Sequence, residues 1–179
     1  MRVITGTARG RKLISPPGKD VRPTTDRVKE AVFSIVQFEI EGRRVLDLFA
    51  GSGQLGIEAL SRGAAEAVFV EQSRAVAEIV RQNLKVTAFF DRARVVNADA
   101  LSFLGTSSDV FDLAFLDPPY SRGLVAKALP VLCGRMAPGA AVVCETLADE
   151  ILPRQVGEFS VHKAYRYAGT LITVYRNTQ

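Results

Sequence analysis

The chain has 179 residues, of which 47% are hydrophobic and 23% are charged, and its formal net charge is +4. A chain of this length can fold as one domain with a substantial core, and this composition argues against a disordered or fibrous protein. No apolar run approaches the ~18 residues of a membrane span, and no signal-peptide stretch is evident, so we expect a cytoplasmic protein. Cys133 and Cys144 lack the spacing of a redox or zinc motif, so we expect no disulfide framework and no metal site.

Positive charge is concentrated near the N-terminus. The first 29 residues carry eight basic and two acidic side chains, whereas the remaining 150 residues have a net charge of −2. A basic arm on a nearly neutral body is typical of a protein that binds a polyanion, although a solvated arm that binds nothing is the alternative. Arg9, Arg11 and Lys12 flank the Gly10 turn, where they could contact phosphates without distinguishing one base from another.

The predicted elements begin with a short hairpin over residues 1–14, where the sequence alternates weakly and contains turn glycines. A helix follows, because Thr24 or Thr25 can cap it and the apolar residues after them recur on one helical face. We expect residues 1–41 to form this basic hairpin and helix, packed on a core domain formed by residues 42–179.

From residue 42 onward, short apolar runs alternate with helical stretches. This alternation predicts an α/β protein with a parallel sheet covered on both faces. The tail differs, because two runs meet at Gly169 with hardly any loop, which predicts an antiparallel hairpin on the sheet edge. The expected strands are 45–49, 67–70, 93–96, 110–116, 140–144, 159–167 and 170–176, and the expected helices are 54–62, 73–87 and 123–133.

A glycine-rich turn joins the first strand of this sheet to its helix. Gly51, Gly53 and Gly56 form G-x-G-x-x-G in the strand, turn and helix context of a nucleotide or adenosyl cofactor site. Asp47 distinguishes between cofactors, because a carboxylate there would repel a pyrophosphate but attract an ammonium group beside a sulfonium. The turn therefore favours S-adenosylmethionine over NAD.

Two further acids end neighbouring strands. Glu71 stands where an acid accepts hydrogen bonds from ribose hydroxyls, with a solvated acid at a helix start as the alternative. Asp99 could accept from an adenine amino group while the Ala100 N–H donates to the ring, and a helix N-cap is an equally good interpretation of Asp99. The candidate cofactor-binding residues are Asp47, Phe49, Gly51, Ser52, Gly53, Glu71, Gln72, Asp99 and Ala100.

The most specific motif is Asp117-Pro118-Pro119-Tyr120, at the end of the fourth strand. An exocyclic aromatic amine is a poor nucleophile because its lone pair is delocalised into the ring. The Asp117 carboxylate and the Pro118 carbonyl can accept hydrogen bonds from its two N–H groups and direct the lone pair at a methyl donor. Pro119 stiffens the loop, and Tyr120 offers a face for base stacking. These four candidate catalytic residues predict in-line methyl transfer to a base that is single-stranded, looped or flipped out.

The glycine turn and Asp-Pro-Pro-Tyr motif resemble those of the class I S-adenosylmethionine-dependent amino-methyltransferases. The stretch 22–33, together with 6–12 and 60–64, is similar to the RsmD-type 16S ribosomal RNA guanine-N2 methyltransferases. The resemblance implies a Rossmann-like, doubly wound and mostly parallel sheet of seven strands with its last strand antiparallel. It also implies S-adenosylmethionine as cofactor and a guanine in the small ribosomal subunit, or in its assembly intermediate, as substrate.

The same resemblance implies that Thr24, Thr25 and Arg27 lie near the cofactor and the active cleft. Gln72, which follows Glu71, is neutral, whereas adenosine sites frequently have an acidic residue at this position. The contact with the ribose is therefore less defined. We expect a monomer. The candidate RNA contacts are Arg2, Arg9, Arg11, Lys12, Arg22, Thr24 and Arg27.

Three other functions stay open. Asp-Pro-Pro-Tyr would equally serve adenine N6 in DNA or RNA, although the chain has no room for a separate DNA target-recognition domain. A cofactor-holding ribosome assembly factor without essential catalysis would have no need of Asp117 and Tyr120. An NAD oxidoreductase would require Asp47 to tolerate a pyrophosphate and would leave the Pro-Pro motif unused.

Overall fold

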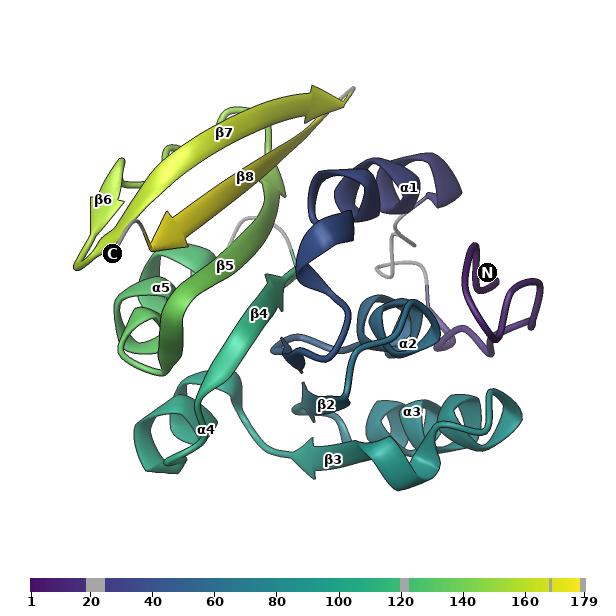
Figure 1. The fold of residues 1–179 in the computed structure, drawn as a ribbon. Coiled ribbons are helices and arrows are strands. Elements are labelled where there is room, and N and C mark those ends of the chain that lie inside the picture. The colour runs from purple at the N-terminus through teal and green to yellow at the C-terminus, as the bar shows by residue number, and fades with distance from the viewer. Residues whose placement is uncertain (19–24, 120–122, 168, 178–179) are drawn as a thin grey trace.

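The computed structural model describes residues 1–18, 25–119, 123–167 and 169–177, and within these ranges eight strands form one sheet (Figure 1). The strand order is β3-β2-β1-β4-β5-β8-β7-β6. The first five strands are mutually parallel, as the alternation of strands and helices predicts. They are β1 (Arg44–Asp47), β2 (Glu66–Glu71), β3 (Ala93–Asn97), β4 (Phe111–Leu116) and β5 (Met136–Leu147).

The antiparallel part of the sheet lies beyond β5. β8 (Thr170–Asn177) pairs antiparallel with both β5 and β7 (Phe159–Tyr167), which confirms the tail hairpin and the antiparallel last strand. The expected count of seven strands is one too low, because β6 (Gln155–Val156) adds a two-residue strand against the start of β7. A two-residue strand leaves no alternating pattern in the sequence, so periodicity could not reveal it.

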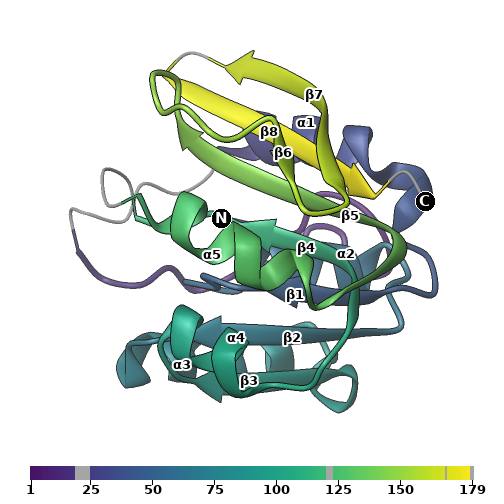
Figure 2. The same cartoon turned by 90° about the vertical axis from the view of Figure 1, so that its left-hand side faces the viewer.

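Helices cover both faces of the sheet (Figures 1 and 2). Because successive side chains of a strand point to opposite faces, Val45 packs with the core on one face and Leu46 with the core on the other, and both are fully buried. The Val45 face is covered by α1 (Asp26–Ile35), α2 (Gln54–Ser61) and α3 (Arg74–Val86), and the Leu46 face by α4 (Ala100–Thr106) and α5 (Leu124–Cys133).

Side-chain caps set the starts of three helices. The Thr25 hydroxyl accepts from the Val28 N–H at the start of α1, so Thr25 is the cap, while Thr24 lies outside the described residues. Ser73 caps α3 in the same way. Asp99 caps α4, a seven-residue helix that the sequence pattern missed because it is too short to show a clear period. Two short 3-10 turns, η1 (Gln37–Glu39) and η2 (Phe90–Arg92), were also not predicted.

The predicted N-terminal hairpin is present in reduced form, with backbone hydrogen bonds from the Val3 N–H to the Arg11 oxygen and from the Leu13 N–H to the Met1 oxygen. Residues 1–14 contain a single antiparallel bridge, between Arg2 and Lys12, rather than two strands. We call residues 1–18 the N-terminal strap. Its apolar residues Val3, Ala8 and Leu13 are buried in the core shared with α1, α2 and α3. The strap therefore packs on the body of the protein, while the division into units 1–41 and 42–179 stays a prediction.

No helix in the described part of the chain is long and apolar enough to span a lipid bilayer.

Candidate active site

The carboxyl ends of β1 and β4 lie side by side where the strand order reverses. From β1 the chain continues to β2 on one side, whereas β4 pairs with the other side of β1 and places Phe115 opposite Asp47. Ligands of open α/β sheets bind outside the carboxyl ends of the strands at such a point. The glycine turn after β1 and the Asp117-Pro118-Pro119 segment after β4 therefore border the same crevice.

A cavity of about 370 Å³ occupies this crevice. Of the nine predicted cofactor-binding residues, eight line it, and Gly53 does not. Three of the four predicted catalytic residues also line it, while Tyr120 lies outside the described residues. The predicted residues on the cavity wall are Asp47, Phe49, Gly51, Ser52, Glu71, Gln72, Asp99, Ala100, Asp117, Pro118 and Pro119.

Gly56 lets helix α2 approach the sheet closely. A Cβ atom at this position would lie 2.3 Å from the Phe69 ring of β2, which is closer than any real side chain tolerates. The Gly56 N–H donates to Asp47 Oδ2 at 2.9 Å. The third glycine of the motif thus serves helix-to-strand packing and also holds the Asp47 carboxyl at the cavity wall.

Asp47 is 1% exposed, and this burial raises its pKa to about 7, although the hydrogen bond from Gly56 opposes the shift and nearby Glu71 adds to it. Burial disfavours the ionised form because the charge loses its hydration. Near neutral pH the carboxyl is therefore poised between its two forms. A cation placed in the cavity would favour the carboxylate.

Glu71 is held by two backbone groups. Its Oε2 accepts from the Gly51 N–H at 3.0 Å and its Oε1 from the Ser73 N–H at 2.8 Å. A carboxylate has about four acceptor positions, so both oxygens keep capacity for further donors such as hydroxyls. The Asn97 side chain also donates to the backbone oxygens of Glu71 and Gln72, a contact that no sequence motif predicts.

Asp99 has a structural role at this site. Its Oδ2 accepts from the Ser102 N–H at 2.9 Å, which confirms the N-cap interpretation, and the residue also lines the cavity. Capping uses one carboxylate oxygen, so the contact with adenine stays a prediction.

The segment after β4 also contributes to the cavity wall. Asp117 is half-buried, Pro118 is buried and Pro119 is exposed. Among the described residues, no group of three or more His, Cys, Asp or Glu side chains could hold a metal ion.

The predicted RNA contacts lie mainly on the strap and at the start of α1. Arg9, Arg11 and Lys12 are exposed, and Arg27 is exposed on α1. Arg2 pairs with Asp26 at 3.2 Å. Neither Arg27 nor the capping residue Thr25 lines the cavity. Arg22 and Thr24 lie outside the described residues.

Sequence reasoning missed that the strap reaches the cavity. Met1 and Pro16, near the two ends of the strap, both line it. The Ser52 hydroxyl of the glycine turn lies 3.1 Å from the sulfur of Met1. No local pattern could have shown this, because the contact joins residues that are 51 positions apart.

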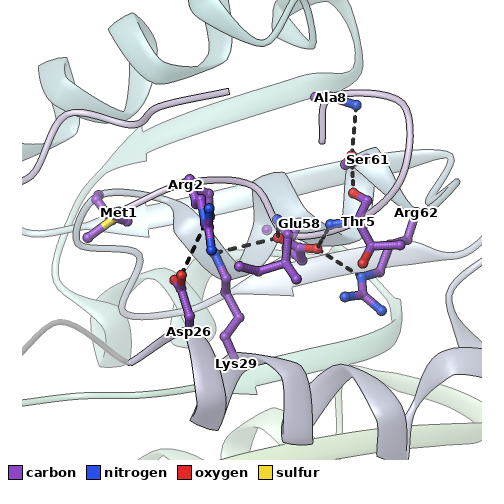
Figure 3. A network of polar contacts seen from close by, with 12 residues as sticks. Met1, Arg2, Thr5, Ala8, Asp26, Lys29, Glu58, Ser61 and Arg62 are labelled. Carbon is purple, nitrogen blue, oxygen red and sulfur yellow. Dashed lines mark hydrogen bonds and ion pairs between the residues drawn. The ribbon is translucent and has the colours of Figure 1, made fainter. Parts of the chain in front are cut away.

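Buried polar side chains of α1 and α2 hold the strap in place, and Figure 3 shows Glu58 at the centre of this network. Glu58 accepts from the backbone N–H groups of Ile4 and Thr5 at 2.8 and 2.9 Å. It also pairs with buried Lys29 at 3.5 Å and with Arg62 at 3.0 Å. Burial lowers the pKa of Lys29 while Glu58 opposes that shift. The one feature of the sequence that could have indicated this network is Glu58, an acidic residue within the mostly apolar helix α2.

Comparisons with known proteins agree with this geometry. A family model described as Conserved hypothetical protein 95 matches residues 1–176. The chain is 41% identical over 165 residues to ribosomal RNA small subunit methyltransferase D of Escherichia coli K12, covering 91% of this chain and 83% of that protein. The enzyme of the same name from Haemophilus influenzae is 40% identical over 157 residues, covering 85% and 81%.

Solved structures share the fold. The Escherichia coli protein yhhF superposes with a TM-score of 0.89 at 38% identity, covering 99% of this chain and 97% of that one. An RNA methyltransferase from Salinibacter ruber, solved in complex with S-adenosyl-L-homocysteine, superposes with a TM-score of 0.67 at 18% identity, covering 87% and 93%. At that identity the second likeness concerns the fold alone.

Proposed function

The chain belongs to the ribosomal RNA small subunit methyltransferase D family, and from this premise we propose that it methylates the N2 amine of a guanine in small-subunit ribosomal RNA. The observation that carries the proposal is the cavity at the strand-order reversal, which is lined by both the glycine turn and Asp117-Pro118-Pro119. A methyl donor and an aromatic amine could meet there.

The cofactor is S-adenosylmethionine, which supplies an electrophilic methyl group on a sulfonium. The cavity volume of about 370 Å³ falls within the range of ~300–1,000 Å³ that is usual for ligand sites. Asp47 would pair with the ammonium group of the cofactor, and Glu71 would accept from its ribose hydroxyls. Asp99 and the Ala100 N–H would hold the adenine, with Phe49, Ser52 and Gln72 completing the contacts.

Residues after β4 would orient the guanine. The Asp117 carboxylate and the Pro118 carbonyl oxygen would accept hydrogen bonds from the two N–H groups of the amine, which would direct its lone pair into the cavity. Transfer would form a nitrogen–methyl bond while the methyl–sulfur bond of the donor breaks and its electron pair stays on sulfur, so that S-adenosylhomocysteine is released. Positive charge would develop on the guanine nitrogen, where the Asp117 anion would stabilise it and then accept one N–H proton. Tyr120 would stack on the base. A paired base cannot reach these groups, so the target must be unpaired or flipped out.

The basic strap would position the RNA. Phosphate contacts fix register and orientation without selecting a base, so base selection falls to the cavity. We place this contact on Arg2, Arg9, Arg11, Lys12, Arg22, Thr24 and Arg27. The substrate would be the small subunit or an assembly intermediate in the cytoplasm, with the protein acting as a monomer.

One assay tests this proposal against its alternatives. Purified protein is incubated with methyl-labelled S-adenosylmethionine and, separately, naked 16S ribosomal RNA, 30S particles and DNA. The product nucleosides are identified by mass spectrometry. Labelled N2-methylguanosine from the RNA or the particles is expected. N6-methyladenosine, or label only in DNA, would replace the guanine proposal, and no transfer to any substrate would favour a binding role.

A further inference from the structure

The strap and the glycine turn together form part of the cavity wall. Met1 and Pro16 contribute from the strap, and Gly51 and Ser52 contribute from the turn. These two segments come from distant parts of the sequence, so some contact must hold them at a fixed separation if they are to line one site.

Asn83 of α3 bridges the two segments, in addition to the contact between Ser52 and Met1. Its side chain is fully buried. Its amide nitrogen donates to the backbone oxygen of Ile14 at 3.0 Å and to that of Ser52 at 2.9 Å, and its oxygen accepts from the Ile14 N–H at 2.7 Å. One side chain therefore binds both backbone groups of a strap residue and the carbonyl of a turn residue.

We propose that Asn83 is a positioning residue for the cofactor: it holds the strap against the glycine turn so that Met1 and Pro16 complete the cavity wall. This inference rests on the proposed function, because it assumes that the cavity binds S-adenosylmethionine. Asn83 does not itself line the cavity, so it acts through Ile14 and Ser52 rather than by touching the ligand.

The alternative is that Asn83 stabilises the fold in general, and Ser61 supplies the matched control. The Ser61 hydroxyl of α2 also fastens the strap, since it accepts from the Ala8 N–H at 3.0 Å and donates to the Thr5 oxygen at 2.6 Å (Figure 3). Neither Thr5 nor Ala8 lines the cavity. Loss of Ser61 should therefore loosen the strap without moving the cavity wall.

The experiment compares wild type, Asn83→Ala and Ser61→Ala by three measurements: calorimetric affinity for S-adenosylhomocysteine, thermal unfolding, and steady-state methyl transfer to RNA. In Asn83→Ala we expect the Kd for S-adenosylhomocysteine and the KM for the cofactor to rise about tenfold, as for the loss of one or two net hydrogen bonds. At saturating cofactor, kcat should stay within about twofold of wild type, because the reacting groups are untouched. Ser61→Ala should lower Tm yet leave the Kd within about twofold.

A further variant approaches the same contact from the strap. Ile14→Pro removes the backbone N–H that donates a hydrogen bond to the Asn83 side-chain oxygen, while Asn83 itself is unchanged. This variant keeps the test available if Asn83→Ala does not fold. It should weaken S-adenosylhomocysteine binding in the same direction. The role of Asn83 would be overturned if Asn83→Ala and Ile14→Pro bind S-adenosylhomocysteine as tightly as wild type does. It would also be overturned if Ser61→Ala loses as much affinity for S-adenosylhomocysteine as they do. Wild-type protein that binds no S-adenosylhomocysteine would refute the proposed cofactor instead.

Discussion

Burial at the cavity wall strongly alters the ionisation of Asp47. Its pKa of about 7 in the folded protein lies above the ordinary value of 3.8, so the folded state keeps a proton that the unfolded state releases. The contribution of Asp47 to the free energy of unfolding is therefore fully present below about pH 4. It falls as pH rises towards 7 and then levels off.

Asp47→Asn should remove this pH dependence while the amide oxygen still accepts from Gly56. We expect the variant to be more stable than wild type at pH 8, by up to about 4 kcal/mol, and the difference to shrink towards pH 4. Thermal unfolding at a series of pH values measures this. A difference between the two proteins that does not change with pH would show that Asp47 is not the group responsible.

The same carboxyl predicts how cofactor binding depends on pH. An ammonium group favours the ionised form, so wild-type affinity for S-adenosylhomocysteine should fall as pH drops below about 7. Asp47→Asn should bind more weakly at pH 8 and show a nearly flat profile across this range. Titration calorimetry from pH 5.5 to 8 gives the comparison, and identical profiles for the two proteins would remove Asp47 from the cofactor site.

Asp117 is expected to act on the reaction and not on cofactor binding. Asp117→Ala removes the acceptor of the amine and the anion that stabilises developing charge, so turnover should fall by at least about 10²-fold. Affinity for S-adenosylhomocysteine should stay within about twofold. Single-turnover methyl transfer and calorimetry separate the two effects, and turnover near the wild-type rate would contradict the assigned role.

At the scale of elements, the sequence predicts what depends on local pattern. Alternating apolar runs indicate β1 to β4 together with α2 and α3, and the G-x-G-x-x-G spacing indicates the turn before α2. The expected hairpin is reduced to a single bridge because much of the strap backbone instead bonds to Glu58, Ser61 and Asn83, which lie 53 to 69 positions along the chain. Partners at that separation leave no periodicity in residues 1–18.

Gly6 offers a test of how the strap meets α2. A Cβ at Gly6 would lie 1.8 Å from the backbone oxygen of Ser61, so Gly6→Ala should force the strap away and cost more than 2 kcal/mol, roughly the upper part of the usual range for point variants. Gly10→Ala is the matched control. Its φ of +82° is close to the +87° of Gly6, but no atom lies within 4 Å of its Cβ position.

The control should therefore carry only the backbone cost of the left-handed conformation, about 1 to 2 kcal/mol. Urea unfolding of both variants gives the comparison. Equal losses of stability would mean that the strap does not pack against Ser61 as described.

For the whole molecule, charge is distributed so that one flank can attract RNA. Neutralising Arg9, Arg11 and Lys12 together to Gln should weaken RNA binding and reduce the slope of log K against log salt by about 2 to 3. The same change at Arg154, Lys163 and Arg166, which are exposed at the antiparallel end of the sheet, should leave the slope nearly unchanged. Equal effects of the two triple variants would mean that the strap is no preferred contact.

The arrangement of the whole site was predictable only in part. The motifs after β1, β2, β3 and β4 could be placed at one edge, because parallel strands carry their carboxyl ends together. The contribution of Met1 and Pro16, and the link through Asn83, follow from how the strap folds back across the glycine turn. That path is set by packing between distant segments, which no motif encodes.

A crystal structure with S-adenosylhomocysteine and an oligonucleotide that presents an unpaired guanine would test the proposed methyl transfer most directly. We expect the cofactor analogue to lie in the cavity that the glycine turn and the segment after β4 line. The guanine amine should be hydrogen-bonded to the Asp117 carboxylate and the Pro118 carbonyl oxygen, and should face the sulfur atom. A cofactor bound elsewhere, or an Asp117 carboxylate turned away from the base, would contradict this proposal.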